Sequence, residues 1–184
     1  MKVERFSIKD VVLFTPKKLG DSRGFFMETF KQDFMDEALG KRVVFVQENH
    51  SQSNAAFTLR GLHFQSPPMA QAKLIRCTKG EMLDVVVDVR KGSRTYGKHL
   101  KASLTAENGA QLYVPAGFLH GFVTLRENTE VQYKCTDYYS QDYEGTVFWN
   151  DEDLGIDWGV TPESAILSDR DSVAPRLKDI SLPF

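Results

Sequence analysis

The stretch Glu81-Met82-Leu83-Asp84-Val85-Val86-Val87-Asp88-Val89 is the clearest strand pattern in the chain, and it points to the fold class. Successive side chains of a β-strand face opposite sides. One side of this stretch therefore carries aliphatic residues, whereas Asp84 and Asp88 lie on the other. The aliphatic set is Leu83, Val85, Val87 and Val89. The pattern predicts a β-strand, and the chain around it repeats the signal.

Shorter apolar and alternating runs flank this stretch on both sides, and turn signals such as Lys91-Gly92-Ser93 and Glu107-Asn108-Gly109 separate them. One run, Val43–Val46, continues into Gln47–His50 and ends at a polar turn over residues 51–54. The other expected strands are 58–65, 72–77, 98–104, 111–114, 122–125 and 130–137. Many short strands at this spacing are typical of a β-sandwich or a jelly-roll barrel.

Helix is scarce in this sequence. Residues 31–39, ended by Gly40, form the only good candidate. The segment from Asp151 onward holds several Gly and Pro residues and is expected to form loops with short helical turns. The fold expected is therefore mainly β, as one domain over residues 1–184.

The composition narrows the classes of protein that fit. The chain has 184 residues, with 23 Lys plus Arg against 25 Asp plus Glu and a formal net charge of −2. Nucleic-acid binders and polybasic membrane binders need a clear cationic excess, so neither is expected. No apolar run approaches the ~20 residues of a membrane span, and residues 1–5 have no apolar segment behind them that would indicate a signal peptide. Cys77 and Cys135 fit buried thiols of a reducing compartment, so a soluble, cytoplasmic protein is expected.

The segment Leu59-Arg60-Gly61-Leu62-His63-Phe64-Gln65 holds the first candidate site residues. By strict alternation His63 and Gln65 lie opposite Leu62 and Phe64, and Arg60 lies on the wrong face to join His63. Gly61 between them is a position where a β-bulge would turn both inward. A histidine in such a strand points either into a lumen or to solvent, and for a single histidine a surface or core position is the plainer interpretation.

A second motif, Pro115-Ala116-Gly117-Phe118-Leu119-His120-Gly121-Phe122, sets a tight turn, after which His120 is expected to open the next strand. This Pro-x-Gly-x-x-His pattern resembles the second motif of the cupin superfamily, whose members are small double-stranded β-helix barrels. Metal-binding cupins carry His-x-His in their first motif. Here the equivalent stretch offers His63 and then Gln65, so no metal is expected.

Tyrosines and basic residues supply the remaining candidates. Tyr133 would usually be core packing, yet with a phenol pKa near ~10 it is a credible general acid opposite a developing carbanion or enolate. Tyr138 and Tyr139 suit stacking on a planar base, with packing at an interface as the plainer account. The cations Arg23, Arg60, Lys73 and Arg76 lie in otherwise apolar strands, where charge is costly unless it is paired, solvated or bound to an anion.

The segment Arg23–Glu28 combines a guanidinium, two aromatic rings and a carboxylate, which makes it a plausible rim for a phosphorylated ligand. No Gly-rich phosphate loop, Gly-x-Ser-x-Gly elbow or Cys-x-x-Cys motif occurs. Hydride, acyl-transfer and thiol chemistry are therefore without support.

Together these segments resemble the dTDP-4-dehydrorhamnose 3,5-epimerases, a family of cupin-fold sugar-nucleotide epimerases. The resemblance extends over nearly the whole chain as an ordered set of motifs. The matching stretches are residues 20–26, 45–49, 59–65, 73–74, 87–91, 114–122, 133–134, 149–151, 155–158 and 167–171.

The resemblance implies epimerisation at C3 and C5 of dTDP-4-dehydro-6-deoxy-D-glucose to dTDP-4-dehydro-L-rhamnose, in dTDP-L-rhamnose biosynthesis. The C4 carbonyl acidifies the protons on C3 and C5, and each inversion needs a base, an acid and stabilisation of the enolate between them. His63 is implied as the base with Asp171 as its partner, Tyr133 as the acid, and Lys73 as the cation facing the enolate oxygen. No cofactor is implied, because proton transfer alone inverts the centres.

The resemblance also implies a set of substrate-binding residues. Arg60 and His120 match contacts near the sugar and diphosphate, and Tyr139 matches a base-stacking position. The other matching positions, most of them in the nucleotide site, are Arg23, Phe26, Glu28, Gln47, Glu48, Asn49, Glu144 and Arg170. The family implies a homodimer in which N-terminal segments complete the partner's sheet and nucleotide site, so that Arg23 and Glu28 would serve the other subunit's pocket.

Two positions depart from the family pattern, since Glu48 stands where Asp is usual and Arg170 stands where Lys is usual before Asp171. Both keep their charge, so altered fit rather than lost function is expected. Three alternatives stay open at this point. They are a relative that inverts only C3 or only C5, a metal-dependent cupin oxygenase or isomerase, and a non-catalytic nucleotide-sugar-binding barrel.

Overall fold

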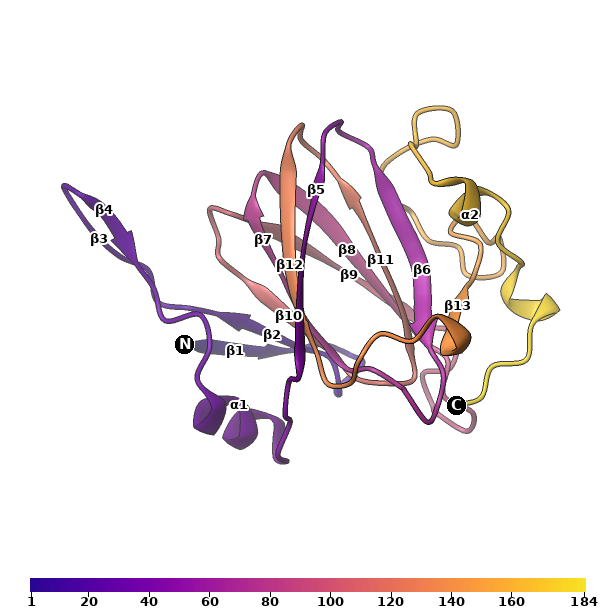
Figure 1. Cartoon of the computed structure of the whole chain (residues 1–184), viewed down its shortest axis with the longest axis horizontal. Helices are drawn as coiled ribbons and strands as arrows, with labels where there is room; N and C mark the ends of the chain where they lie inside the picture. Colours follow the sequence, from indigo (N-terminus) through magenta and orange to yellow (C-terminus); the bar gives the residue numbers. More distant parts are fainter.

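The computed structural model describes residues 1–184, and two antiparallel β-sheets that face each other form its body (Figure 1). The six-stranded sheet has the order β1-β2-β10-β7-β12-β5, with bounds Lys2–Arg5, Val12–Thr15, Gln111–Val114, Lys73–Lys79, Thr129–Cys135 and Gln47–Ser53. The five-stranded sheet has the order β13-β6-β11-β8-β9, with bounds Glu144–Thr146, Leu59–Gln65, Phe118–Thr124, Glu81–Asp88 and His99–Thr105. The predicted mainly-β jelly-roll arrangement is confirmed.

The other elements lie outside these sheets. A hairpin of β3 (Leu19–Asp21) and β4 (Gly24–Phe26) projects away from the body, and α1 (Gln32–Leu39) follows it (Figure 1). The C-terminal segment holds α2 (Asp169–Ser172), and short 3-10 turns occupy Gln141–Tyr143 and Leu177–Asp179. Neither α-helix combines the length and the apolarity that crossing a bilayer requires.

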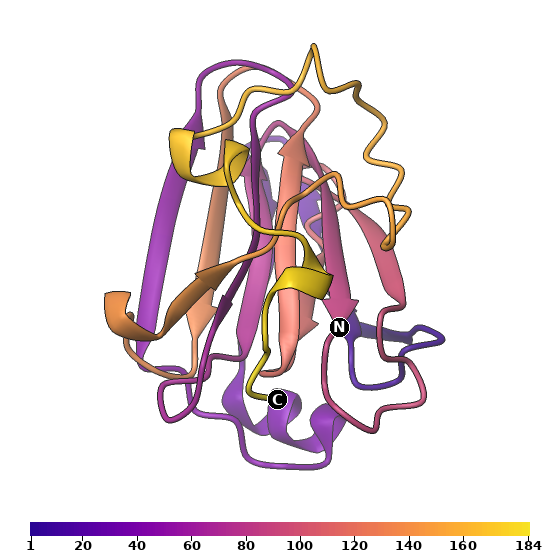
Figure 2. The same ribbon diagram turned by 90° about the vertical axis from the view of Figure 1, so that its right-hand side faces the viewer.

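Three apolar layers hold the fold together. The inner core fills one part of the space between the sheets, with Ile75 and Leu112 from one sheet and Val86 and Phe122 from the other. The second layer lies on the outer face of the five-stranded sheet, which the C-terminal segment covers with Trp149, Trp158 and Leu182 (Figure 2). The third lies under α1, where Met35 packs with Val12, Phe14 and Leu74.

The five-stranded sheet is packed on both faces, and this explains the apolar residues on both sides of β8. Val85 and Val87 of β8 face the C-terminal segment, whereas Val86 faces the inner core. Asp84 and Asp88 lie on the same side of β8 as Val86, and both are fully buried. Each carboxylate has a cationic or hydrogen-bonding partner, as burial of charge requires.

Three predictions about the strands are wrong. Residues 43–46 form no strand, because Val43 packs under α1 and its N–H donates to the side chain of Asp36 at 2.9 Å. Strand β5 instead includes Ser51–Ser53, which looked like a turn, since those polar residues pair with β12 over a long sequence distance. Strand β11 likewise begins at Phe118, so His120 lies within it and does not open it.

The helix and the cysteines follow prediction. The helix spans Gln32–Leu39, and Gly40 caps its C-terminus with a φ of 66°, the left-handed conformation that glycine adopts most readily. Cys77 and Cys135 are both free and buried. The segment after Asp151 forms loops and short helical turns, as expected.

Asp88 ties one end of the barrel together. Its buried carboxylate accepts hydrogen bonds from Arg90 (Nε at 2.9 Å and Nη2 at 2.8 Å), Ser93 Oγ (2.6 Å) and Thr95 Oγ1 (2.6 Å). Burial alone would raise the pKa of Asp88, but these hydrogen bonds outweigh it and hold the pKa well below the ordinary value.

We expect Asp88→Asn to lower the free energy of unfolding by about 3 kcal/mol at neutral pH, because it leaves Arg90 without its buried partner. A carboxyl with a depressed folded pKa stabilises the fold above its unfolded pKa, and that contribution is lost as the pH falls toward the folded value. The difference between wild type and variant should therefore narrow below pH ~4 in urea titrations. Asp10→Asn is the control, since Asp10 is the exposed partner of Arg90 (Nη1 at 2.8 Å). An unchanged difference at acid pH would contradict the assignment.

Candidate active site

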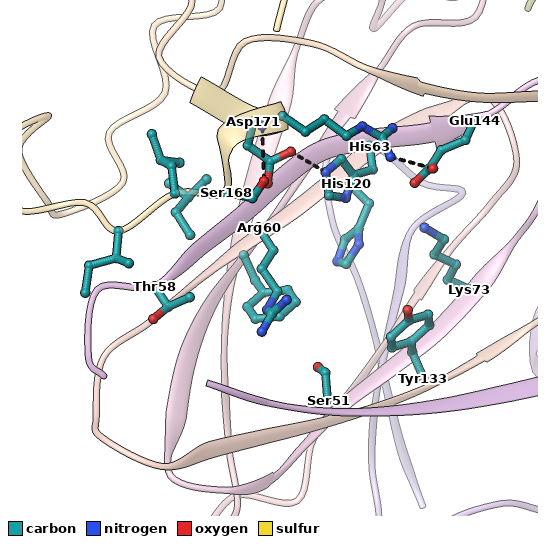
Figure 3. A pocket seen from close by; sticks show the side chains of 15 residues that line it. Ser51, Thr58, Arg60, His63, Lys73, His120, Tyr133, Glu144, Ser168 and Asp171 are labelled. Atoms are coloured by element: carbon teal, nitrogen blue, oxygen red, sulfur yellow. Dashed lines mark hydrogen bonds and ion pairs between the residues drawn. The ribbon is translucent and has the colours of Figure 1, made fainter. Parts of the chain in front are cut away.

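A cavity of about 490 Å³ opens between the two sheets beside the inner core (Figure 3). Along β7, Ile75 and Cys77 belong to the core, whereas Lys73 on the same face lines the cavity. Side chains from both sheets and from the C-terminal segment contribute to the wall. The predicted site residues that it brings together are Arg60, His63, Lys73, His120, Tyr133, Glu144, Arg170 and Asp171.

A β-bulge in β6 turns both Arg60 and His63 into this cavity. In the ladder with β11, His63 pairs with His120 and Arg60 pairs with Phe122, so β6 carries one residue more than its neighbour in this interval. The extra residue cancels the alternation that would have placed Arg60 on the opposite face. The prediction of a bulge at Gly61 is confirmed.

Glycine is required where the bulge meets β11. A Cβ on Gly61 would lie 2.6 Å from Gly121 Cα, and the φ of Gly61 is +133°. A Cβ on Gly121 would lie 2.9 Å from the carbonyl oxygen of Arg60. The two backbones therefore approach each other at a distance that only paired glycines allow.

His63 and Asp171 form a hydrogen-bonded pair, with 2.7 Å between Nε2 and Oδ1. Asp171 is 3% exposed, belongs to α2, and also accepts the N–H of Gly61 at 3.4 Å. Burial would raise the pKa of Asp171, but the hydrogen bond and charge of His63 hold it below the ordinary value. A carboxylate that stays ionised here accepts a hydrogen bond from the ring and fixes its orientation.

A second histidine–carboxylate pair lies deeper. His120 Nε2 is 2.9 Å from Asp84 Oδ2, and Asp84 is fully buried. Burial raises the pKa of Asp84, although the charges of His120 and Lys73 oppose the shift. Its other oxygen, Oδ1, has no hydrogen-bond partner. Asp84 was not among the predicted site residues. The only sequence signal for it is a carboxylate placed within an apolar strand.

Lys73 and Tyr133 stand on the facing sheet, opposite His63 and His120 (Figure 3). They come from neighbouring strands, and Lys73 Nζ is 5.9 Å from the centre of the Tyr133 ring. Burial lowers the pKa of Lys73 and raises the pKa of Tyr133. The wall therefore presents a protonated phenol and the amino group of Lys73 across the cavity from a histidine held by a carboxylate.

A smaller cavity of about 240 Å³ adjoins the first and shares His63, Lys73, Tyr133 and Glu144 with it. Its other polar walls are Gln47, Asn49, Gln65, Gln71 and Tyr139. The Tyr139 hydroxyl donates to Glu144 Oε2 at 2.8 Å, and Arg170 Nη1 reaches the same oxygen at 2.5 Å. The exposed ring of Tyr139 is thereby linked through Glu144 to Arg170.

Four predicted residues lie outside both cavities of the single chain. Arg23 and Phe26 lie in the projecting hairpin and Glu28 just after it, and Phe26 is 69% exposed (Figure 1). Glu48 lies on the opposite face of β5 from Gln47 and Asn49, where it pairs with Lys134 at 3.0 Å. The structure also contains no group of three or more His, Cys, Asp or Glu side chains placed to hold a metal ion.

Comparison with known proteins identifies close relatives over the whole length. A family model described as dTDP-4-dehydrorhamnose 3,5-epimerase matches residues 5–179. The dTDP-4-dehydrorhamnose 3,5-epimerase of Salmonella typhimurium is 50% identical over 179 residues, which are 96% of each chain. A Legionella pneumophila dTDP-6-deoxy-D-glucose-3,5-epimerase, solved in complex with dTDP-4-keto-L-rhamnose, has a TM-score of 0.94 at 40% identity, covering 99% of this chain and 97% of that one. A 3'-monoepimerase of Streptomyces bikiniensis, solved in complex with dTDP-quinovose, has a TM-score of 0.88 at 35% identity, covering 95% and 87%.

Proposed function

The chain belongs to the dTDP-4-dehydrorhamnose 3,5-epimerase family, and we infer that it converts dTDP-4-dehydro-6-deoxy-D-glucose to dTDP-4-dehydro-L-rhamnose by inverting C3 and C5. The observation that carries the mechanism is the placement of His63 and Tyr133 on facing sheets across one cavity (Figure 3). An epimerase must remove a proton from one face of a carbon and return one to the other. Groups on opposite walls meet that need.

His63 acts as the base in this mechanism. Its ring takes the proton from the carbon next to the C4 carbonyl, and the electron pair of the broken C–H bond moves to form the enolate. The ionised Asp171 at 2.7 Å stabilises the imidazolium that results. Tyr133 then donates its phenolic proton to the opposite face of the same carbon. The sequence is repeated at the second carbon after each residue has regained its starting protonation state from solvent.

Lys73 stabilises the enolate between the two proton transfers. Its ammonium group lines the same cavity as His63 and Tyr133, where negative charge develops on the C4 oxygen. In the proposal Arg60 and His120 contact the sugar and the diphosphate. Asp84 orients the His120 ring through their hydrogen bond. Proton transfer needs no cofactor, and none enters any step.

The smaller cavity holds the nucleotide. Tyr139 presents an exposed ring for stacking on the base, with Glu144 and Arg170 beside it. Gln47 and Asn49 line the same cavity and offer amide groups to the nucleotide. Glu48, which faces outward next to Lys134, would contribute only through an interface with a second chain.

We propose a homodimer in which the β3–β4 hairpin enters the partner's nucleotide site. The hairpin exposes Phe25 and Phe26, at 58% and 69%, and carries Arg23 away from its own cavities (Figure 1). Exposed aromatic rings on a projecting hairpin suit a partner surface better than solvent. A monomer in solution that retains full turnover would contradict this proposal.

Residues 1–184 act as one domain in this proposal, since Arg60 and Asp171 of one cavity come from distant parts of the chain. A cytoplasmic location is supported by the two free cysteines. Recovery of the protein from an extracytoplasmic fraction would contradict that location.

A single-centre epimerase is the second candidate, favoured by the similarity to the Streptomyces bikiniensis 3'-monoepimerase. The higher identity to the Salmonella typhimurium 3,5-epimerase, 50% against 35%, supports inversion of both centres.

We expect turnover of dTDP-4-dehydro-6-deoxy-D-glucose in deuterium oxide to place deuterium at both C3 and C5 of the product. Each inversion replaces a carbon-bound proton by one from a residue that exchanges with solvent. Proton NMR and mass spectrometry of the product test this together with its stereochemistry. Deuterium at one carbon only would establish the single-centre alternative, and an absence of turnover would overturn the function.

His63→Ala and Tyr133→Phe should each lower kcat by at least ~100-fold, the scale of a lost general base or acid, while dTDP still binds. Initial rates and calorimetric dTDP titrations measure the two effects. His99→Ala and Tyr143→Phe are matched controls, because neither side chain lines the two cavities. Full turnover in a site variant would remove that residue from the mechanism.

The alkaline side of the kcat profile should report on Lys73. Because burial lowers the pKa of Lys73, the lysine loses its proton at a pH lower than the ordinary value of ~10.4. The raised pKa of Tyr133 keeps the phenol protonated over the same range. The rate should therefore fall as the pH rises through the lowered pKa. In Lys73→Arg the fall should move to higher pH, because a guanidinium stays charged. A profile that does not move would assign the fall to another group.

A further inference from the structure

We propose that Gln65 is a positioning residue for the nucleotide end of the site. Its side-chain amide holds the segment Tyr138–Ser140, and thereby sets the ring of Tyr139 for stacking on the base. The inference rests on the proposed function, in which Tyr139 meets the nucleotide. Gln65 ends β6, two residues after His63, and lines the smaller cavity.

The amide of Gln65 is committed to the main chain. The residue is 5% exposed. Its Nε2 donates to the carbonyl oxygens of Met69 and Tyr138, the second at 2.9 Å, and its Oε1 accepts the N–H of Ser140 at 2.9 Å. Both donors of the amide are used, so Gln65 acts on a ligand through the chain that it holds.

The segment around Tyr139 relies on side chains for its backbone hydrogen bonds. The N–H of Tyr138 donates to Asp137 Oδ1, that of Tyr139 to Gln47 Oε1, and that of Ser140 to Gln65 Oε1. The first two distances are both 2.8 Å. No strand or helix includes these residues. The position of the segment therefore depends on the side chains that accept from it.

Gln65 brackets Tyr139, because it bonds the residue before it and the residue after it. The ring of Tyr139 has one further anchor, the hydrogen bond from its hydroxyl to Glu144. Glu144 pairs with Gln65 in the β13–β6 ladder. Gln65 therefore holds the backbone on both sides of Tyr139. It also pairs with Glu144, the residue that accepts the hydrogen bond from the Tyr139 hydroxyl.

Gln65→Met tests this, because methionine keeps the length of the side chain and removes all three hydrogen bonds. We expect the Kd for dTDP and the KM for the sugar nucleotide to rise ~10-fold or more, with kcat at saturation within ~3-fold of wild type. Inorganic pyrophosphate, which has no base to stack, should bind both proteins equally. Gln52→Met is the control, since the Gln52 amide bonds only Asn54 and Asn128.

A double variant shows whether Gln65 acts through the ring. In a Tyr139→Ala background, Gln65→Met should weaken dTDP binding no further, because the group that it positions is gone. Additive losses would overturn the proposal, as would equal losses of dTDP and pyrophosphate binding or a large fall in kcat.

Gln65→Glu guards against a variant that does not fold. It keeps the acceptor for the Ser140 N–H and removes both donors, so hydrogen exchange at Ser140 should be faster in Gln65→Met than in Gln65→Glu. A similar exchange rate in wild type and Gln65→Met would contradict the anchoring. Wild type that fails to bind dTDP would overturn the proposed function, whereas equal dTDP binding by wild type and Gln65→Met would overturn only the role of Gln65.

Discussion

The active-site cavity depends on the close approach of two backbones, at Gly61 in β6 and Gly121 in β11. Neither position has room for a Cβ, and β6 carries one residue more than β11 across this interval. Because of the extra residue, Arg60 and His63 both point into the cavity, whereas Leu62 packs in the second apolar layer under the C-terminal segment. One local irregularity thus satisfies packing on one face of the sheet and chemistry on the other.

Charge inside the barrel is tolerated because it is paired across short distances. His63 and His120 each meet a buried carboxylate, at 2.7 and 2.9 Å, and both pairs stand on the five-stranded side of the cavity. The six-stranded sheet supplies Lys73 and Tyr133 from the opposite side. The separation of the proposed base and the proposed acid onto two sheets follows from the barrel itself, since each sheet turns one face inward.

Local patterns predicted most of the strands and the single longer helix, because apolar alternation and a terminal glycine are local properties. They failed at β5, where the polar residues 51–53 become a strand only through pairing with β12. The short strands β1 to β4 and β13 were not predicted, since each is three or four residues long and gains its order from a neighbour. Among site residues, Asp84 had no predicted role, because its partner His120 lies 36 positions away.

The sequence by itself predicted the class of fold and the bulge at Gly61, and its resemblance to a known family supplied the residues that we propose for the chemistry. Those features rest on residue types and on their spacing and order along the chain. Tertiary structure alone paired Asp84 with His120 and supplied the distance of 2.7 Å between His63 and Asp171, a pair that the resemblance had implied across 108 positions. Contacts of that kind arise when two sheets close over a shared interior, and no local pattern encodes their distances.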